Sequence, residues 1–127
     1  MERAIGLLET ISIAGGIEAA DAMVKTAQVR LLFEELSQPG FHMVIDDIGV
    51  LRALGVIETF SVASCILAAD AAVKAGGVKL VEIRPAMGLG GKSYVTMLGD
   101  VSTVEAAVEA GRQKTEPEGM LVKSVVI

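Results

Sequence analysis

The 127-residue chain is long enough for one ordinary domain or two very small ones and can bury a hydrophobic core, and its composition is 52% hydrophobic but only 3% aromatic. The net charge of −5, with 11 scattered basic residues, argues against a nucleic-acid partner, and charged residues interrupt every apolar run before it reaches the roughly 18 residues of a membrane-spanning helix. A mean hydropathy of +0.58 is high, so we expect part of the surface to be buried against other copies.

The chain contains an internal repeat. The stretch AIGLLETISIAGGIEAADAMVKTAQVRL from Ala4 aligns without gaps with ALGVIETFSVASCILAADAAVKAGGVKL from Ala53, and about half of the aligned positions are identical. Each copy begins with a short apolar strand that ends in Glu-Thr, at Glu9 and Glu58. Because the same acid recurs in both copies, we expect it to have a structural role rather than a catalytic one.

A helix follows each Glu-Thr pair, with Ser12 and Ser61 as the predicted N-caps. Apolar residues then recur at i, i+4, i+7 and i+11, which predicts one buried stripe on each helix. The stripe of the first helix comprises Ile13, Ile17, Ala20 and Val24, and that of the second comprises Val62, Ile66, Ala69 and Val73.

The second copy continues with alternating strands and a helix. We expect strands at 78–83 and 94–98, a helix opened by the capping box of Ser102 and Glu105, and a last strand at 121–127. The fold class is therefore α/β (α+β): helices packed on one face of an antiparallel or mixed sheet, in ferredoxin-like layers and internally repeated.

The loop between the two middle strands ends in Gly-Lys-Ser, like a phosphate-binding loop. Ala86 stands where the first glycine of that pattern belongs, and a strand rather than a helix follows the loop. A nucleotide phosphate needs the N–H groups of a helix N-terminus, so we do not expect nucleotide binding here.

Metal sites and disulfides are not expected either. The single cysteine, Cys65, excludes an internal disulfide and a Cys-pair metal site, and we predict that it is a small buried helix residue. The single histidine, His42, has no second ligand at metal spacing. The first residues, Met1 to Ala4, do not resemble an export signal, so we expect a cytoplasmic protein.

Several stretches closely resemble the bacterial microcompartment (BMC) shell-protein domain. They are AIGLLET and IEAADAMVKTAQV in the first copy, and LGVIET, AADAAVKAGGVKLV and GGKSYVTMLGDVSTVEAAVEAG in the second. Two copies in one chain resemble the tandem-domain members of the family, most closely the type found in propanediol-utilisation shells. The resemblance covers nearly the whole chain. We expect an incomplete first repeat with a connector at 1–52, and a complete second repeat at 53–127.

The resemblance implies a structural protein and not an enzyme. Members of the family form flat cyclic tiles, hexamers of one domain or trimers of two, which assemble with other shell proteins around a microcompartment. A pore on the symmetry axis passes metabolites. For this chain a homotrimer is favoured, with a hexamer as the alternative. The pore-loop residues implied are Ser37, Gln38, Pro39 and Gly40 in the first copy, and Met87, Gly88, Leu89, Gly90, Gly91 and Lys92 in the second.

Tandem proteins of the propanediol type carry a cysteine before Pro-Gly in the first pore loop, and three copies hold an iron-sulfur cluster. Gln38 occupies that place here. An amide is not a thiolate, so we expect no cluster and no other cofactor.

The lysine that closes the repeated helix lies at the tile edge in this family. Lys25 with Asp21 and Lys74 with Asp70 are therefore predicted edge contacts, although the same i, i+4 spacing also fits simple helix-surface pairs. The alternative function is a small ferredoxin-like ligand-binding or regulatory domain that takes a metabolite at Gly88–Lys92.

Overall fold

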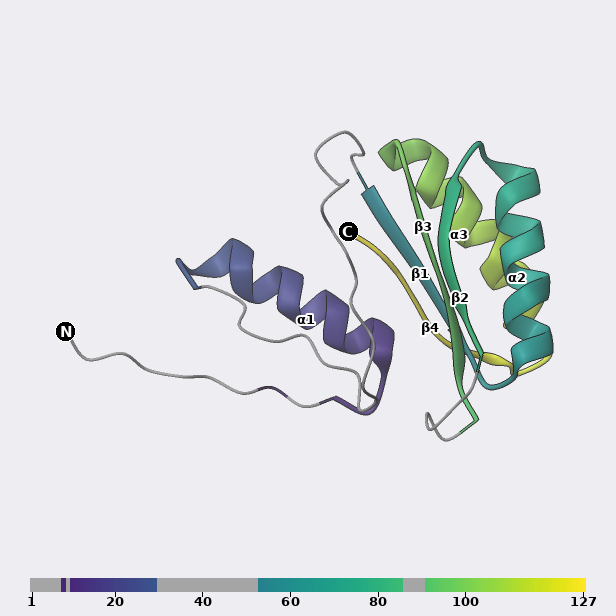
Figure 1. Ribbon diagram of the computed structural model, residues 1–127, viewed down its shortest axis with the longest axis horizontal. Coiled ribbons are helices and arrows are strands. Elements are labelled where there is room, and N and C mark those ends of the chain that lie inside the picture. Colours follow the sequence, from purple (N-terminus) through teal and green to yellow (C-terminus); the bar gives the residue numbers. More distant parts are fainter. Residues whose placement is uncertain (1–7, 9, 30–52, 86–90) are drawn as a thin grey trace.

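The computed structural model describes residues 8, 10–29, 53–85 and 91–127 of the chain. The described residues form three helices and four strands, coloured along the chain in Figure 1. In chain order they are α1 (Ile13–Thr26), β1 (Ala53–Thr59), α2 (Val62–Ala75), β2 (Lys79–Arg84), β3 (Ser93–Gly99), α3 (Val101–Thr115) and β4 (Leu121–Val126).

The four strands form one antiparallel sheet in the order β2-β3-β1-β4. The first strand lies in the interior, where Val56 is opposite Thr96 of β3 and Val125 of β4. Every residue of β1 and β3 is buried, because both faces of these two strands are covered. The mixed helix and sheet architecture confirms the predicted fold class, and the sheet is antiparallel throughout its described strands.

Helices cover both faces of the sheet (Figure 1). On one face, α2 and α3 pack side by side over a core that includes Ile57, Val95 and Met97. On the opposite face, α1 packs over a second and separate cluster of buried side chains. The two helices of the second copy, α2 and α3, thus share one face as predicted, and α1 of the first copy lies on the opposite face.

The two repeated helices begin as predicted. Ser12 Oγ accepts a hydrogen bond from Gly15 N at 3.2 Å, and Ser61 Oγ accepts one from Ser64 N at 3.1 Å. Each hydroxyl thus satisfies one of the free N–H groups in the first turn.

The predicted capping box at the start of α3 is wrong. The N-cap is Asp100, and its side chain makes no capping hydrogen bond. Because β3 extends to Gly99, only one residue separates the strand from the helix, and α3 begins at Val101. Ser102 is consequently the second residue of the helix rather than its cap.

The predicted stripe is correct for most of α1 and wrong for most of α2. On α1, the stripe is buried except for Val24. On α2, only the stripe residue Ala69 is buried, whereas Ile66 and Val73 are exposed. The buried face of α2 instead comprises Ser64, Cys65, Ala68, Ala69 and Ala72.

The neighbouring helix explains this rotation of the buried face. A side chain at Gly111 of α3 would contact Ile57 and would place its Cβ 3.1 Å from the carbonyl oxygen of Ala68. The two helices can approach this closely because both residues at the contact are small. Alanine rather than isoleucine therefore lies at the centre of the contact between α2 and α3.

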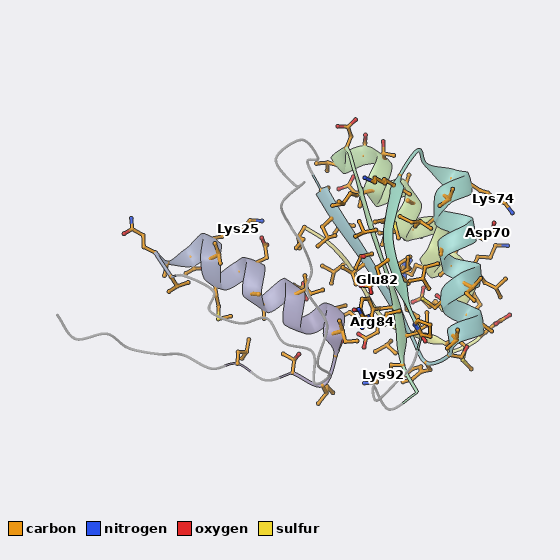
Figure 2. The ribbon with its side chains drawn as sticks, in the orientation of Figure 1. Lys25, Asp70, Lys74, Glu82, Arg84 and Lys92 are labelled. Carbon is orange, nitrogen blue, oxygen red and sulfur yellow. The ribbon has the colours of Figure 1, made fainter. Side chains whose placement is uncertain are left out.

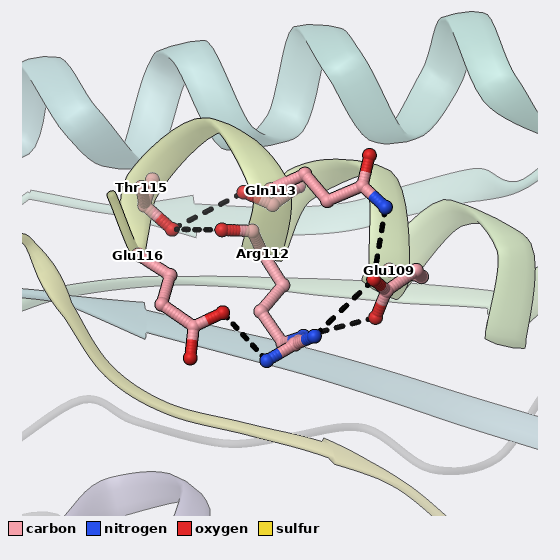
Figure 3. Close-up of polar contacts among 6 residues, drawn as sticks. Glu109, Arg112, Gln113, Thr115 and Glu116 are labelled. Atoms are coloured by element: carbon pink, nitrogen blue, oxygen red, sulfur yellow. Dashed lines mark hydrogen bonds and ion pairs between the residues drawn. The ribbon is translucent and has the colours of Figure 1, made fainter. Parts of the chain in front are cut away.

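The outer surface of α3 carries a network of charged side chains (Figure 3). Arg112 donates to Glu109 at 2.9 Å and to Glu116 at 2.6 Å, and Gln113 also donates to Glu109. The hydrogen bond from Arg112 is the main cause that lowers the pKa of Glu109. These pairs stabilise the helix only slightly, since their side chains are exposed to water.

Candidate functional site

Glu58 connects the sheet to the N-terminal end of α1. Its side chain is 0% exposed. Oε2 accepts hydrogen bonds from Ser12 Oγ at 2.6 Å and from Ala14 N at 3.2 Å. Oε1 accepts one from Ile13 N at 3.3 Å. Because the free N–H groups and the dipole of a helix N-terminus favour negative charge, this carboxylate caps α1 from another element of the fold. Glu58 therefore has a structural role, as predicted, whereas Glu9 lies outside the described residues.

An apolar surface surrounds Glu58 and receives α1. The helix contributes Ile13, Ala14 and Ile17 to this contact. The sheet contributes one face of β1, β3 and β4, and we refer to this surface as the α1 seat: Leu54, Val56, Glu58, Tyr94, Leu98 and Val125. α1 packs on these apolar residues, whereas α2 and α3 pack on the other face of the sheet.

Two lysines make further polar contacts, one with α1 and one with the residue before its N-cap. Lys92 Nζ donates to the carbonyl oxygen of Ile11 at 2.8 Å. Lys123 of β4 forms an ion pair with Glu18. Neither contact could be predicted from the sequence, since no spacing or motif relates these residues. Along the chain, the contacted residues Ile11 and Glu18 lie on either side of the residues that Glu58 caps. The two lysine contacts therefore fix the direction of α1 on the sheet.

Of the predicted pore-loop residues, the structure describes Gly91 and Lys92. A strand, β3, follows the loop, as predicted, so the loop does not lead directly into a helix. Gly91 has φ +84°, a left-handed conformation that favours glycine. Lys92 lies at the base of the loop, near the start of β3, and its ammonium contacts the backbone before α1 (Figure 2).

The other loop residues of the predicted pore lie outside the described part of the chain: Ser37, Gln38, Pro39 and Gly40 from the first copy, and Met87, Gly88, Leu89 and Gly90 from the second. Their assignment to a pore stays a prediction.

Both predicted edge lysines contact the aspartate one turn earlier. Lys25 Nζ lies 2.9 Å from Asp21, and Lys74 Nζ lies 2.7 Å from Asp70. The lysine side chains are 68% and 74% exposed, and in Figure 2 both Lys74 and Asp70 point away from the sheet. These are the i, i+4 pairs expected on a helix surface. Their contact with a neighbouring tile stays a prediction.

Cys65 is buried in α2, as predicted. Burial raises its pKa to about 11, only partly offset by a hydrogen bond with Thr59. The thiol is therefore protonated and unreactive near neutral pH. Among the described residues, no group of three or more His, Cys, Asp and Glu side chains is close enough to hold a metal ion. None of the described helices is long and apolar enough to cross a membrane.

Large apolar side chains are exposed on α2 and on β2. They come from the outer side of the helix and from alternate positions of the edge strand, and we call them the α2–β2 surface: Ile66, Leu67, Val73, Val81 and Ile83. Among the described strands, β2 has a neighbour on one side only. This part of the molecule thus presents both apolar side chains and a sheet edge to solvent.

Comparison with known proteins shows which family this architecture belongs to. The BMC domain model matches residues 4–46 and 53–127. The bacterial microcompartment shell protein PduT of Citrobacter freundii is 36% identical over 170 aligned positions, which cover 100% of this chain and 92% of the relative. The aligned length exceeds this chain's own length because the relative has residues that this chain lacks. The shell protein EutK of Escherichia coli K12 is 52% identical over 40 residues, 32% of this chain and 24% of the relative.

Among solved structures, a microcompartment protein of Desulfitobacterium hafniense DCB is 42% identical, with a TM-score of 0.59, over 91% of this chain and 88% of that protein. The likeness thus extends from sequence to fold along nearly the whole chain. The chain therefore belongs to the BMC-domain family, whose relatives named here are proteins of bacterial microcompartments.

Proposed function

We propose that this chain is a structural shell protein of a bacterial microcompartment, located in the shell inside the cytoplasm, and not an enzyme. The full-length similarity to a shell protein carries this proposal. The chain assembles with itself into a cyclic tile, and tiles assemble with other shell proteins. A central pore, formed by the glycine-rich loops, passes metabolites.

The α2–β2 surface supports self-association. It combines exposed apolar side chains on α2 and β2 with the open edge of the sheet. Soluble monomers rarely expose large contiguous apolar patches, because burying that area against a partner is favourable by about 25 cal/mol per Å². A second copy that covers this surface would remove the patch from water.

The repeat favours a trimer. Two copies of the domain in each chain give six similar positions around a threefold axis, which is the geometry of a closed ring. A hexamer is the alternative if only the complete repeat builds the ring. Glycines in the loop at 87–91 suit a crowded axis, since the absence of a Cβ lets backbones approach closely.

No iron-sulfur cluster is part of this proposal. The donor set does not fit one, because Gln38 stands where tandem shell proteins of the propanediol type have a cysteine, and the only thiol, Cys65, is buried within α2. Anaerobic reconstitution with iron and sulfide should leave the protein colourless, whereas brown protein with stoichiometric iron would contradict this part.

The native mass tests the ring. We expect light scattering at micromolar concentration to give three times the intact chain mass, or six times for the alternative, and electron microscopy to show sheets of tiles. The variant Val81→Lys, Ile83→Lys places charge on the α2–β2 surface and should release monomers. Lys114→Glu, on the exposed end of α3, is the matched control and should leave the ring intact. A wild-type monomer would refute the proposal.

The alternative of a metabolite-binding domain is tested separately. Isothermal titration with nucleotides and small organic acids should give no heat of specific binding under the shell proposal. Micromolar binding of one ligand per chain, lost on Lys92→Ala, would favour the alternative instead. The existing contact of Lys92 with Ile11 makes that lysine a poor anion ligand, because an anion would have to displace it.

A further inference from the structure

The two repeated helices begin in the same local geometry. Thr10 Oγ1 donates to the carbonyl oxygen of Ser12 at 2.7 Å, and Thr59 Oγ1 donates to that of Ser61 at 2.8 Å. Each serine also caps its own helix through the same backbone position. The two helix starts therefore carry equivalent donors, so a difference between them lies in their acceptors.

At the start of α1, one carboxylate receives every one of these donors. They are Ser12 Oγ, Ile13 N and Ala14 N, and all three donate to Glu58. The acid belongs to the second copy of the repeat, whereas the helix belongs to the first. One repeat thus caps the helix of the other.

The equivalent donors of α2 lack such a carboxylate. Ser61 Oγ donates to Ser64 Oγ at 2.9 Å instead. No hydrogen bond joins the amides of Val62 and Ala63 to another described residue, and the first turn of α2 contains no acid. Because free N–H groups and the dipole of a helix N-terminus favour negative charge, the start of α2 suits a carboxylate from elsewhere.

A further hydroxyl lacks an acceptor at the same end of the sheet. Ser93 Oγ is buried and has no hydrogen-bond partner among the described residues. Ser93 lies opposite Thr59, whose own hydroxyl contacts Ser61 at the start of α2. Ala63 is exposed, and Ser61 is half-buried. The first turn of α2 is therefore accessible to a side chain from outside.

We propose that the start of α2 binds the carboxylate of Glu9 from a second copy of this chain, as the start of α1 binds Glu58. Glu9 is the repeat twin of Glu58. In a closed ring of repeats, each acid then caps the helix of the preceding repeat, alternately within a chain and between chains. The proposal deepens the self-association proposed above and rests on it.

The position of Thr10 explains why the carboxylate comes from another molecule. Thr10 lies beside α1, since a Cβ on Gly16 would be 3.1 Å from Thr10 Oγ1. α1 and α2 lie on opposite faces of the sheet (Figure 1). The sheet therefore stands between Thr10 and α2 of the same chain, and the acid that precedes Thr10 in the sequence has to be supplied by a neighbour.

Amide hydrogen exchange in the full-length protein, followed by NMR, tests the contact. Glu9→Gln keeps the size of the side chain but removes its charge. We expect exchange at Val62 and Ala63 to become about tenfold faster, because a hydrogen bond to a charged group is lost. Exchange in the first turn of α1 should not change. Glu2→Gln removes the same charge from the same end of the chain and is the matched control. Unchanged exchange at Val62 and Ala63, or an equal effect from the control, would overturn the proposal.

A mixing experiment identifies the molecule that supplies the acid. Isotope-labelled Glu9→Gln chains are refolded together with a large excess of unlabelled wild-type chains. We expect slow exchange to return in α2 of the labelled chains, because their neighbours now carry Glu9. If the wild type alone is protected but the mixture is not, the acid comes from the same chain and the proposal is wrong.

A variant of α2 tests the same contact from the other side. Val62→Pro removes one donor, and proline suits the first position of a helix. Ser61 before it already has the extended backbone that proline requires, with φ −141° and ψ 152°. In this background, Glu9→Gln should change exchange at Ala63 less than threefold, whereas a full tenfold effect would show that Glu9 acts elsewhere. The native mass of the wild type reports ring formation independently, so failure of this contact and failure of the shell proposal are distinguishable.

Discussion

The helices α1 and α2 have matching sequences but pack in different ways. Both begin at a serine N-cap and both carry an Asp-Lys pair one turn apart. Yet α1 buries Ile13 and Ile17, whereas α2 buries alanines and Cys65 and exposes Ile66. The two helices also lie on opposite faces of one sheet.

This difference shows that the partner, and not the helix alone, selects the buried face. α2 lies beside another helix, where only small side chains fit between backbones. Among the described helices, α1 is the one that packs on its face of the sheet, where isoleucines fill the space above the strands. Since both faces of the repeated helix are apolar, the same sequence pattern serves either position. The predictions below test this account, from the largest expected effect to the smallest.

The largest effect is expected where α2 meets α3. In Gly111→Val, the new side chain would collide with Ile57 and with the backbone of Ala68. We expect the free energy of unfolding to fall by about 3 kcal/mol, measured by urea denaturation followed by circular dichroism. Gly77→Val is the control, because nothing lies within 4 Å of a Cβ there, and its effect should be within about 0.5 kcal/mol. Equal losses in the two variants would show that this contact is not tight.

Twin positions test the comparison directly. Ile17 and Ile66 correspond in the repeat, but Ile17 is 6% exposed and Ile66 is 53% exposed. Ile17→Ala should weaken the docking of α1 by about 2 kcal/mol, which speeds amide exchange in α1 about thirtyfold. Ile66→Ala should leave exchange in both helices nearly unchanged. If each substitution had the same effect on amide exchange in its own helix, Ile17 and Ile66 would not differ in burial as the structure shows.

Glu58 offers a smaller and more local perturbation. Glu58→Gln keeps the size of the side chain but removes the charge that receives Ser12 and two backbone N–H groups. A hydrogen bond to a charged group contributes about 1.5 kcal/mol, so amide exchange in the first turn of α1 should become about tenfold faster. Exchange in α2 should not change. Asp21→Asn, at the half-buried partner of Lys25 on the same helix, is the control, and an equal effect from it would argue against a specific cap.

The smallest effect on stability is expected from the exposed lysines. The double variant Lys25→Ala, Lys74→Ala should lower the free energy of unfolding by about 1 kcal/mol or less, because exposed ion pairs contribute little. If these lysines lie at the tile edge, the ring should keep its size on a sizing column but no longer form extended sheets. If the variant still forms normal sheets in the electron microscope, the prediction of a tile-edge contact is wrong, and the two lysines only pair with aspartates on the helix surface.

The sequence predicted most elements of the described fold because their signals are local. Alternation and β-branched residues predicted the strands around the glycine-rich loop, and the serines predicted the starts of α1 and α2. The predicted start of α3 was wrong because pairing with the neighbouring strands extends β3 to Gly99. The end of β3 then determines where α3 begins. A capping box is a weaker constraint than a strand that continues to Gly99.

The candidate site was less predictable because it depends on contacts between distant residues. Repetition indicated a structural role for Glu58, but its partner, the first turn of α1, lies 44 to 46 positions earlier in the chain. The contacts of Lys92 and Lys123 have no sequence signal at all. The periodicity of α2 could not reveal which apolar face would meet α3, since a hydrophobic period fixes the spacing of a stripe and not its neighbour.

The strand order has a consequence for how the protein is made. β1 pairs with β4, in which Val126 lies opposite Gly55. This hydrogen-bonding edge of β1 therefore stays uncovered until β4 has been synthesised. On the ribosome, the sheet therefore closes only after the residues of β4 have left the exit tunnel, and pairing between such distant segments is slow. α1 is synthesised before the other described helices, but the sheet surface on which it packs is completed last, when β4 joins β1.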